Sequence, residues 1–255
     1  MRSPPARPLH WIGDPDPSGR ALVLLHGAGG HHGLWLPVWR ELRARGVPAL
    51  AVDLPGHGGS APPPEWTVEG LADAVARGLR EAGVGSWVAA GHSLGGAVAL
   101  TLAASGDPAV LGLGAVATGA RLGVNPAILE GIRTAFDATV DRIARWCYPK
   151  GTPEAVWKEA AATLAAAGPG VLWNDFEACR RYGLSPEALG RIAVPTAVVC
   201  GDRDVMTPPE LSRELAEAIP RAGLRVVPGA GHMVILEAPG AVAEALAELW
   251  KRAAG

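Results

Sequence analysis

The chain has 255 residues, of which 49% are hydrophobic and 19% are charged, enough hydrophobic residues for a buried core. The 23 basic and 25 acidic residues nearly cancel, which excludes the strong positive charge typical of nucleic-acid-binding proteins. Three widely spaced cysteines indicate neither a disulfide framework nor a zinc site, and the first residues lack the hydrophobic segment of a secretory signal. We therefore expect a cytoplasmic protein without a membrane span.

Short hydrophobic runs bounded by Gly or Pro alternate with helical patterns along most of the chain. Uniformly hydrophobic runs are typical of strands that are covered on both faces. The alternation predicts a mostly parallel sheet flanked by helices. The expected strands span 21–25, 47–52, 86–90, 112–117, 193–200 and 224–227, and the expected helices 34–45, 68–82, 95–104, 210–218 and 241–252.

The alternation stops between residues 119 and 190. Asn125-Pro126 and Thr152-Pro153 each combine a residue typical of a helix start with a following proline. Hydrophobic residues recur at helical spacing from Ile128 to Trp146, and a Gly-Pro-Gly sequence at 168–170 separates the second helix from a third over 171–182. We predict an all-helical cap, residues 119–190, inserted into a core domain formed by residues 1–118 and 191–255.

Residues Gly91-His92-Ser93-Leu94-Gly95 match the pattern G-x-S-x-G, directly after an expected strand and before an expected helix. A chain that turns this sharply needs glycines around the central residue, and it presents the hydroxyl of Ser93 at the tip of the turn. The alternative is a Gly-rich turn with an incidental serine. The position between strand and helix favours Ser93 as a nucleophile.

The loop His26-Gly27-Ala28-Gly29-Gly30 follows the first expected strand. Its small residues let the backbone approach a ligand, and one of its N–H groups together with that of Leu94 could stabilise an oxyanion. A phosphate-binding loop G-x-G-x-x-G would need a third glycine at position 32, which is His32, and no G-K-[ST] follows. The loop therefore favours acyl-transfer chemistry over nucleotide binding.

A serine nucleophile needs a base, and the base needs an orienting carboxylate. Of the seven histidines, His232 follows the last expected strand, where parallel sheets carry their sites, whereas four others lie in Gly-rich loops. Asp202 and Asp204 both follow the preceding strand. Asp202 could cap the turn, so we prefer Asp204, which lies further into the loop, and the order Ser93, Asp204, His232 suits such a sheet.

Five motifs in this order, HGAGG, DLPGHGGS, GHSLGG, GDRD and GAGH, resemble the α/β-hydrolase family and specifically its capped serine esterase and lipase-like members. The resemblance implies an α/β-hydrolase fold, supports Asp204 over Asp202 as the acid, and assigns the oxyanion donors to the backbone N–H groups of Ala28 and Leu94. Serine at position 93 differs from the aspartate nucleophile of dehalogenase-like and epoxide-hydrolase-like members. The resemblance implies no metal and no organic cofactor.

We therefore expect a carboxylic-ester hydrolase that forms an acyl-enzyme with small to medium, largely hydrophobic acyl groups. A small-molecule ester is the expected partner, and a homodimer is a further hypothesis. A hydrolase of carbon–carbon, thioester or amide bonds on the same triad, and a non-catalytic ligand-binding protein, remain alternatives. The candidates for the wall of the acyl pocket are Trp35, Trp146, Trp157 and Trp173.

Overall fold

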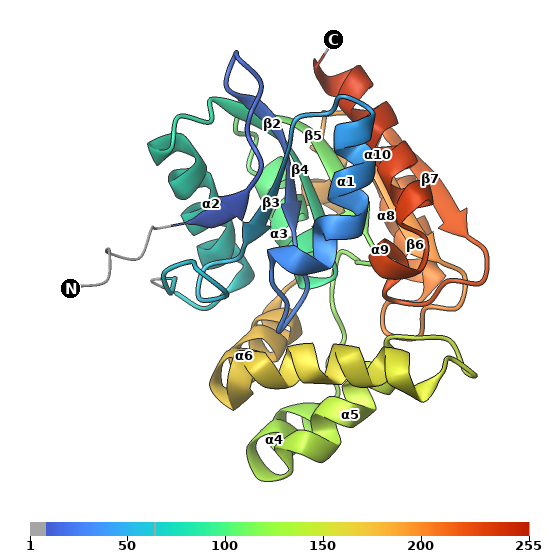
Figure 1. Ribbon diagram of the computed structural model, residues 1–255. Helices are drawn as coiled ribbons and strands as arrows, with labels where there is room; N and C mark the ends of the chain where they lie inside the picture. The colour runs from blue at the N-terminus through green and yellow to red at the C-terminus, as the bar shows by residue number, and fades with distance from the viewer. Residues whose placement is uncertain (1–8, 64, 255) are drawn as a thin grey trace, which may run out of the picture.

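The computed structural model describes residues 9–63 and 65–254 (Figure 1), so residues 1–8, 64 and 255 of the predicted core domain lie outside the described part. Seven strands form one sheet in the order β1-β3-β2-β4-β5-β6-β7. β1 pairs antiparallel with β3, and the other neighbours are parallel. The strands are β1 (His10–Ile12), β2 (Arg20–Leu25), β3 (Ala49–Asp53), β4 (Ser86–His92), β5 (Val110–Val116), β6 (Thr196–Gly201) and β7 (Ala222–Val227).

Helices cover both faces of the sheet (Figure 1). Alternate side chains of one strand enter two different hydrophobic clusters: Leu22 and Leu24 pack on the side of α1 and α10, whereas Val23 and Leu25 pack on the side of α2, α3 and α8. Burial on both faces is the reason that these strands are uniformly hydrophobic in sequence. The helices are α1 (Leu36–Ala44), α2 (Val68–Glu81), α3 (Leu94–Ala104), α8 (Pro209–Ala218) and α10 (Pro239–Ala254), with the short η1 (His32–Trp35) and α9 (Val234–Glu237).

A helical insertion, residues 126–181, lies between β5 and β6 in the chain and beyond one end of the sheet (Figure 1). The Asn125 side chain accepts a hydrogen bond from the N–H of Ala127, which fixes the start of the first helix as the sequence predicts. The last long helix bends at Gly168, where φ is +80°. The insertion contains α4 (Pro126–Thr134), α5 (Phe136–Trp146) and α6 (Glu154–Arg181), and α7 (Pro186–Gly190) follows it.

Several elements differ from the sequence-based expectation, among them the short helices α7 and α9, which it did not contain. Strand β1 has only three residues at the sheet edge, too short for a hydrophobic pattern to reveal it. The helical spacing from Ile128 to Trp146 gives no sign of the break at Ala135, whose φ of −150° and ψ of 59° separate α4 from α5. Among the described residues, no helix is long and apolar enough to cross a membrane. The division into core and cap domains remains a prediction.

Candidate active site

Ser93 lies on the sharp turn between β4 and α3 with φ 53° and ψ −116°, a conformation that costs free energy for any residue with a side chain. Two hydrogen bonds to the adjacent strand end hold it. The N–H of Ser93 donates to the carbonyl of Val116 at 3.0 Å, and its carbonyl accepts from the hydroxyl of Thr118 at 2.9 Å. The end of β5 therefore stabilises the strained backbone of the candidate nucleophile.

The two glycines of the motif allow this turn to pack against its neighbours. A Cβ atom at Gly91 would collide with the carbonyl of Gly95, and a Cβ atom at Gly95 would collide with the carbonyl of Leu25 at the end of β2. Both contacts are with backbone atoms, which a side-chain rotation cannot relieve. The spacing G-x-S-x-G is thus a steric requirement of the turn in this chain.

Asp204 and His232 form a buried pair beside this turn. Oδ2 of Asp204 lies 2.9 Å from Nδ1 of His232 and accepts from the Thr207 hydroxyl at 2.7 Å. Oδ1 accepts the backbone N–H groups of Met206 and Thr207 at 2.8 and 2.9 Å. Burial would raise the pKa of Asp204. The charge and hydrogen bond of His232, together with the two hydrogen bonds from Thr207, outweigh burial and lower that pKa. The carboxylate is therefore ionised and acts only as an acceptor, so Nδ1 of the ring carries a proton and Nε2 is free to accept one.

Asp202 does not share this environment. Its side chain is exposed, and its Oδ1 accepts the backbone N–H of Gly229 at 2.7 Å. It joins the loop after β6 to the loop after β7, a turn-stabilising role of the kind considered from the sequence.

Three contacts fix the loop that carries His232. Both carboxylate oxygens of Glu237 accept the N–H of Gly231 at 3.0 Å, and the N–H of Met233 donates to the carbonyl of Cys147 at 3.1 Å. Cys147 follows α5, so the helical insertion contributes directly to the position of the imidazole.

The third contact comes from His92, next to the candidate nucleophile. Its Nε2 donates to the carbonyl of His232 at 2.8 Å, and the two rings lie 4.7 Å apart between centroids. Burial lowers the pKa of His92 from 6.5 to about 3. The ring is therefore neutral at ordinary pH and serves as a fixed hydrogen-bond donor beside the site.

Ser93 and His232 line the same cavity of about 700 Å³. In the described part of the chain, no hydrogen bond joins the Ser93 hydroxyl to the ring; such contacts are often long in unliganded enzymes and shorten when substrate binds. Most of the wall is hydrophobic, with side chains from both the core and the insertion, including Ile143, Val156, Leu164, Phe176, Met206 and Leu236.

The two expected oxyanion donors stand differently toward this cavity: Leu94 is not among the described residues of its wall, although Ser93 directly before it is. Ala28 lines its wall, and within the described residues the backbone N–H of Ala28 donates to no other group. Leu94 is the first residue of α3, so its N–H has no acceptor within the helix. Both N–H groups are thus available to a ligand, and the helix dipole adds positive potential at the second.

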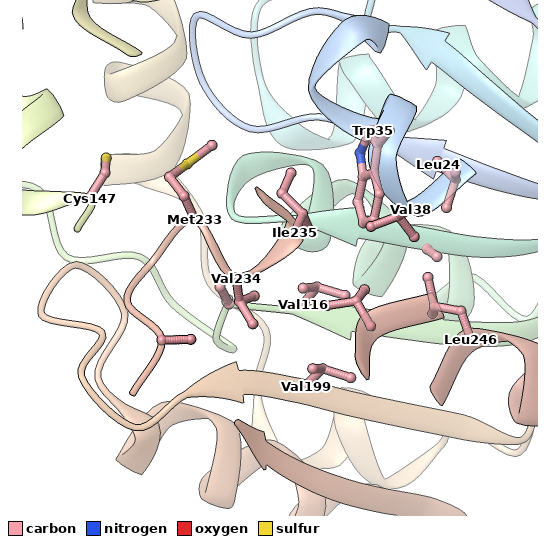
Figure 2. Packing of buried hydrophobic residues seen from close by; sticks show 14 of the residues in the cluster. Leu24, Trp35, Val38, Val116, Cys147, Val199, Met233, Val234, Ile235 and Leu246 are labelled. Carbon is pink, nitrogen blue, oxygen red and sulfur yellow. The ribbon is translucent and has the colours of Figure 1, made fainter. Parts of the chain in front are cut away.

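None of the four tryptophans expected to line the pocket is among the described residues of the cavity wall. Trp35 is fully buried in the same core cluster as Val38 and Ile235 (Figure 2). The other three belong to helices of the insertion but face elsewhere: the Trp146 side chain is 41% exposed, and guanidinium groups of neighbouring arginines lie 4.3 and 4.1 Å from the rings of Trp157 and Trp173. Helical spacing identifies a packed face but not whether that face meets a cavity.

A cluster that the sequence did not reveal surrounds Asp53 at the end of β3. Nδ1 of His10 lies 2.7 Å from Oδ2, and Nδ1 of His32 lies 2.9 Å from Oδ1. Each carboxylate oxygen also accepts one backbone N–H, from Gly59 and His32 respectively. With both oxygens occupied by N–H donors, the cluster joins β1, the loop after β2 and the loop after β3 in a hydrogen-bonded connection.

Comparison with known proteins gives evidence that is independent of the geometry of the site. A sequence model of the alpha/beta hydrolase family matches residues 22–245. A pimeloyl-[acyl-carrier protein] methyl ester esterase of Chromobacterium violaceum is 34% identical, across 90% of this chain and 94% of that protein. A 2-succinyl-6-hydroxy-2,4-cyclohexadiene-1-carboxylate synthase of Salmonella schwarzengrund is 30% identical, across 91% and 94%.

Among solved structures, that of a thermophilic esterase superposes with a TM-score of 0.81 at 29% identity, covering 96% of this chain and 98% of that one. The match confirms the fold expected from the five motifs. One conclusion follows from the seven-stranded sheet, the order of the five sequence motifs and these relatives: the chain is a hydrolase and belongs to the alpha/beta hydrolase family.

Proposed function

We propose that this protein is a serine hydrolase that cleaves carboxylic esters of small to medium, largely hydrophobic acyl groups through an acyl-enzyme. The observation that carries the proposal is the Asp204–His232 pair, whose imidazole lines the same hydrophobic cavity as Ser93 on its strained turn. The similarity to a methyl ester esterase and to a thermophilic esterase supports an ester as the substrate.

In the proposed reaction, Nε2 of His232 takes the proton of the Ser93 hydroxyl as its oxygen attacks the ester carbonyl. The N–H groups of Ala28 and Leu94 stabilise the negative oxygen of the tetrahedral intermediate. His232 returns the proton to the departing alcohol, and Asp204 stabilises the imidazolium formed between these steps. The same ring then activates a water molecule, which releases the acid and restores Ser93.

The cavity wall supports the choice of a hydrophobic acyl group. Its charged residues, among those described, are Arg40, Glu159 and Glu237, one cation against two acids. A substrate with several carboxylates would meet net negative charge there, whereas a neutral ester would not. We also propose that residues 119–190 form a cap whose side chains set the acyl length.

Chemistry at a carbon–carbon bond is the second candidate, because a protein named 2-succinyl-6-hydroxy-2,4-cyclohexadiene-1-carboxylate synthase is 30% identical. The charge of the wall counts against a carboxylate-rich substrate of this kind. A panel that includes esters, thioesters, amides and such a carboxylate separates the alternatives, because the triad itself does not select the bond that is cleaved.

The test is hydrolysis of p-nitrophenyl acetate, butyrate and octanoate by the wild type and by Ser93→Ala. We expect turnover by the wild type and none above the background of the uncatalysed reaction by the variant. Ser105→Ala, at the other end of α3, is the matched control, because its hydroxyl donates to the carbonyl of Leu102 and accepts the N–H of Asp107, and Ser105 is not among the described residues of the cavity wall. Equal turnover by Ser93→Ala would refute the nucleophile. A fluorophosphonate that labels the wild type but not Ser93→Ala would exclude a non-catalytic protein.

A further inference from the structure

Asp175, on α6 of the helical insertion, is fully buried beneath the loop after β2. Its Oδ2 accepts the backbone N–H of Gly29 at 2.8 Å and lies 2.9 Å from Nε2 of His57. Its Oδ1 accepts the indole N–H of Trp66 at 3.0 Å. One carboxylate therefore connects the insertion to the loop after β2 and to the segment between β3 and α2. A buried carboxylate with three such partners is costly to remove.

Gly29 follows Ala28, whose N–H is the first proposed oxyanion donor. Because a peptide group is planar, holding the N–H of Gly29 also fixes the carbonyl of Ala28 and restricts rotation about its Cα. Gly29 has φ +62°, and a Cβ atom there would press on the side chains of Leu164 and Leu172 from α6. The loop thus has close packing and a hydrogen bond to a buried carboxylate on the side of α6.

His57 lies against the buried carboxylate of Asp175. Its Nε2 faces the carboxylate, and its Nδ1 lies 3.3 Å from the carbonyl of Pro55, so both ring nitrogens face acceptors. Burial would lower the pKa of His57, but the hydrogen bond and charge of Asp175, with a smaller contribution from Asp53, outweigh it and raise that pKa. The neighbouring ring of His26, 4.9 Å away, holds the same loop by donating from Nδ1 to the carbonyl of Gly27 at 2.8 Å.

We propose that Asp175 is a positioning residue for the oxyanion hole: from the helical insertion it holds the loop 26–30 so that the N–H of Ala28 faces the oxygen that becomes negative on Ser93 attack. The inference rests on the proposed ester hydrolysis and adds to it a role for the insertion in the chemical step. Asp175 itself does not touch substrate, because it is absent from the described cavity wall.

This role predicts an effect on the transition state and not on substrate binding. Loss of one oxyanion donor lowers kcat by about 10²–10³-fold. We expect Asp175→Ala to lower kcat by about 10²-fold and to change KM by less than about 3-fold. The affinity for an alkyl boronic acid, which forms a tetrahedral adduct with serine, should fall in parallel with kcat/KM.

The chain offers a matched rescue. In Asp175→Asn, the amide oxygen can still accept from Gly29, but its NH₂ group then faces the indole N–H of Trp66, and two donors repel. Trp66→Phe removes that second donor. We therefore expect Trp66→Phe alone to keep kcat within about 3-fold of wild type, and the double variant to recover at least about 10-fold of the loss seen in Asp175→Ala.

Amide hydrogen exchange of Gly29, followed by NMR, tests the contact without any substrate. The exchange should be at least about 10-fold faster in Asp175→Ala and near wild type in Trp66→Phe.

Should Asp175→Ala not fold, Asp175→Leu, which fills the site but has no acceptor, replaces it. A variant with a lower Tm but an unchanged kcat per folded molecule would overturn the proposal. A wild type that cleaves no ester would refute the proposed function and with it the catalytic role, while the exchange of Gly29 would still report on the contact.

Discussion

Replacing Asp204 by asparagine tests how the candidate triad selects the tautomer of its base. Oδ1 of Asp204 accepts two backbone N–H groups, from Met206 and Thr207, which only an oxygen can satisfy. The asparagine oxygen must therefore occupy the Oδ1 position, and its NH₂ group must occupy that of Oδ2, facing Nδ1 of His232. An NH₂ donor at this point requires an unprotonated Nδ1, so the ring proton moves to Nε2.

A ring with its proton on Nε2 cannot accept the proton of Ser93. Inversion of the tautomer in this way lowers kcat by about 10⁴-fold in a serine protease with the same three residue types, which corresponds to about 5.5 kcal/mol of activation free energy. We expect a loss of this size for Asp204→Asn, with KM changed little, because the carboxylate does not contact the cavity that holds the substrate. The Thr207 hydroxyl can turn to donate elsewhere, so the fold should survive.

The assay is steady-state hydrolysis of p-nitrophenyl butyrate, with thermal unfolding as the check on folding. Asp202→Asn is the control, because an amide oxygen can still accept the N–H of Gly229, and its kcat should stay within about 2-fold of wild type. A folded Asp204→Asn that retains more than a tenth of the wild-type kcat would refute the reasoning about the tautomer, and a large loss in Asp202→Asn would move the acid to that residue.

Three further predictions follow from the packing and the titration of the site. Gly95→Ala should destabilise the protein by about 1–3 kcal/mol or prevent folding, because its methyl group meets backbone carbonyls; a wild-type midpoint of urea unfolding would contradict this. Burial lowers the pKa of both His26 and His92 from 6.5 to about 3, so below pH 6.5 the unfolded chain binds protons that the folded chain does not. The free energy of unfolding should therefore fall as the pH falls from 6.5 toward 3, by up to about 1.4 kcal/mol per pH unit for each ring, and an equal Tm at pH 7 and pH 5 would count against it. Val156 lies in the cavity wall and is 40% exposed, and Val156→Trp adds bulk there. The KM should therefore rise about 10-fold for the octanoate ester and stay nearly constant for the acetate. A parallel rise for both esters would show that this position does not limit acyl length.

The sequence was informative where the structure is repetitive or sterically constrained. Most of the parallel strands could be predicted because burial on both faces leaves uniformly hydrophobic runs; the edge strand β7 is only partly buried and left only a short run around Arg225, and the three-residue β1 left no such signal. Ser93, Asp204 and His232 could be named because each follows a strand in a parallel sheet, so the topology brings their loops to one edge. Their roles remain a proposal until the variants are measured.

The sequence was uninformative where a contact joins distant segments. Asp175 is 146 residues from Gly29 and 118 residues from His57, and nothing in its neighbourhood along the chain distinguishes it from a solvent-facing acid of a helix. The four tryptophans lie outside the described cavity wall for a related reason: the sequence pattern does not tell which side of a helix borders a cavity, and only the three-dimensional packing decides it.

Besides its side chains in the cavity wall, the insertion forms hydrogen bonds to two loops of the site: the carbonyl of Cys147 accepts from the loop of His232, and the carboxylate of Asp175 accepts from Gly29. If these helices swung outward as a unit, both hydrogen bonds would break at once. Such an open form would admit substrate to the cavity, but the loops of His232 and Gly29 would no longer be held in place for catalysis. Reactants would have to enter through local movements near the rim, for example around Val156. Exchanging this segment for that of a relative, in order to change selectivity, would therefore have to preserve these two anchors to keep turnover.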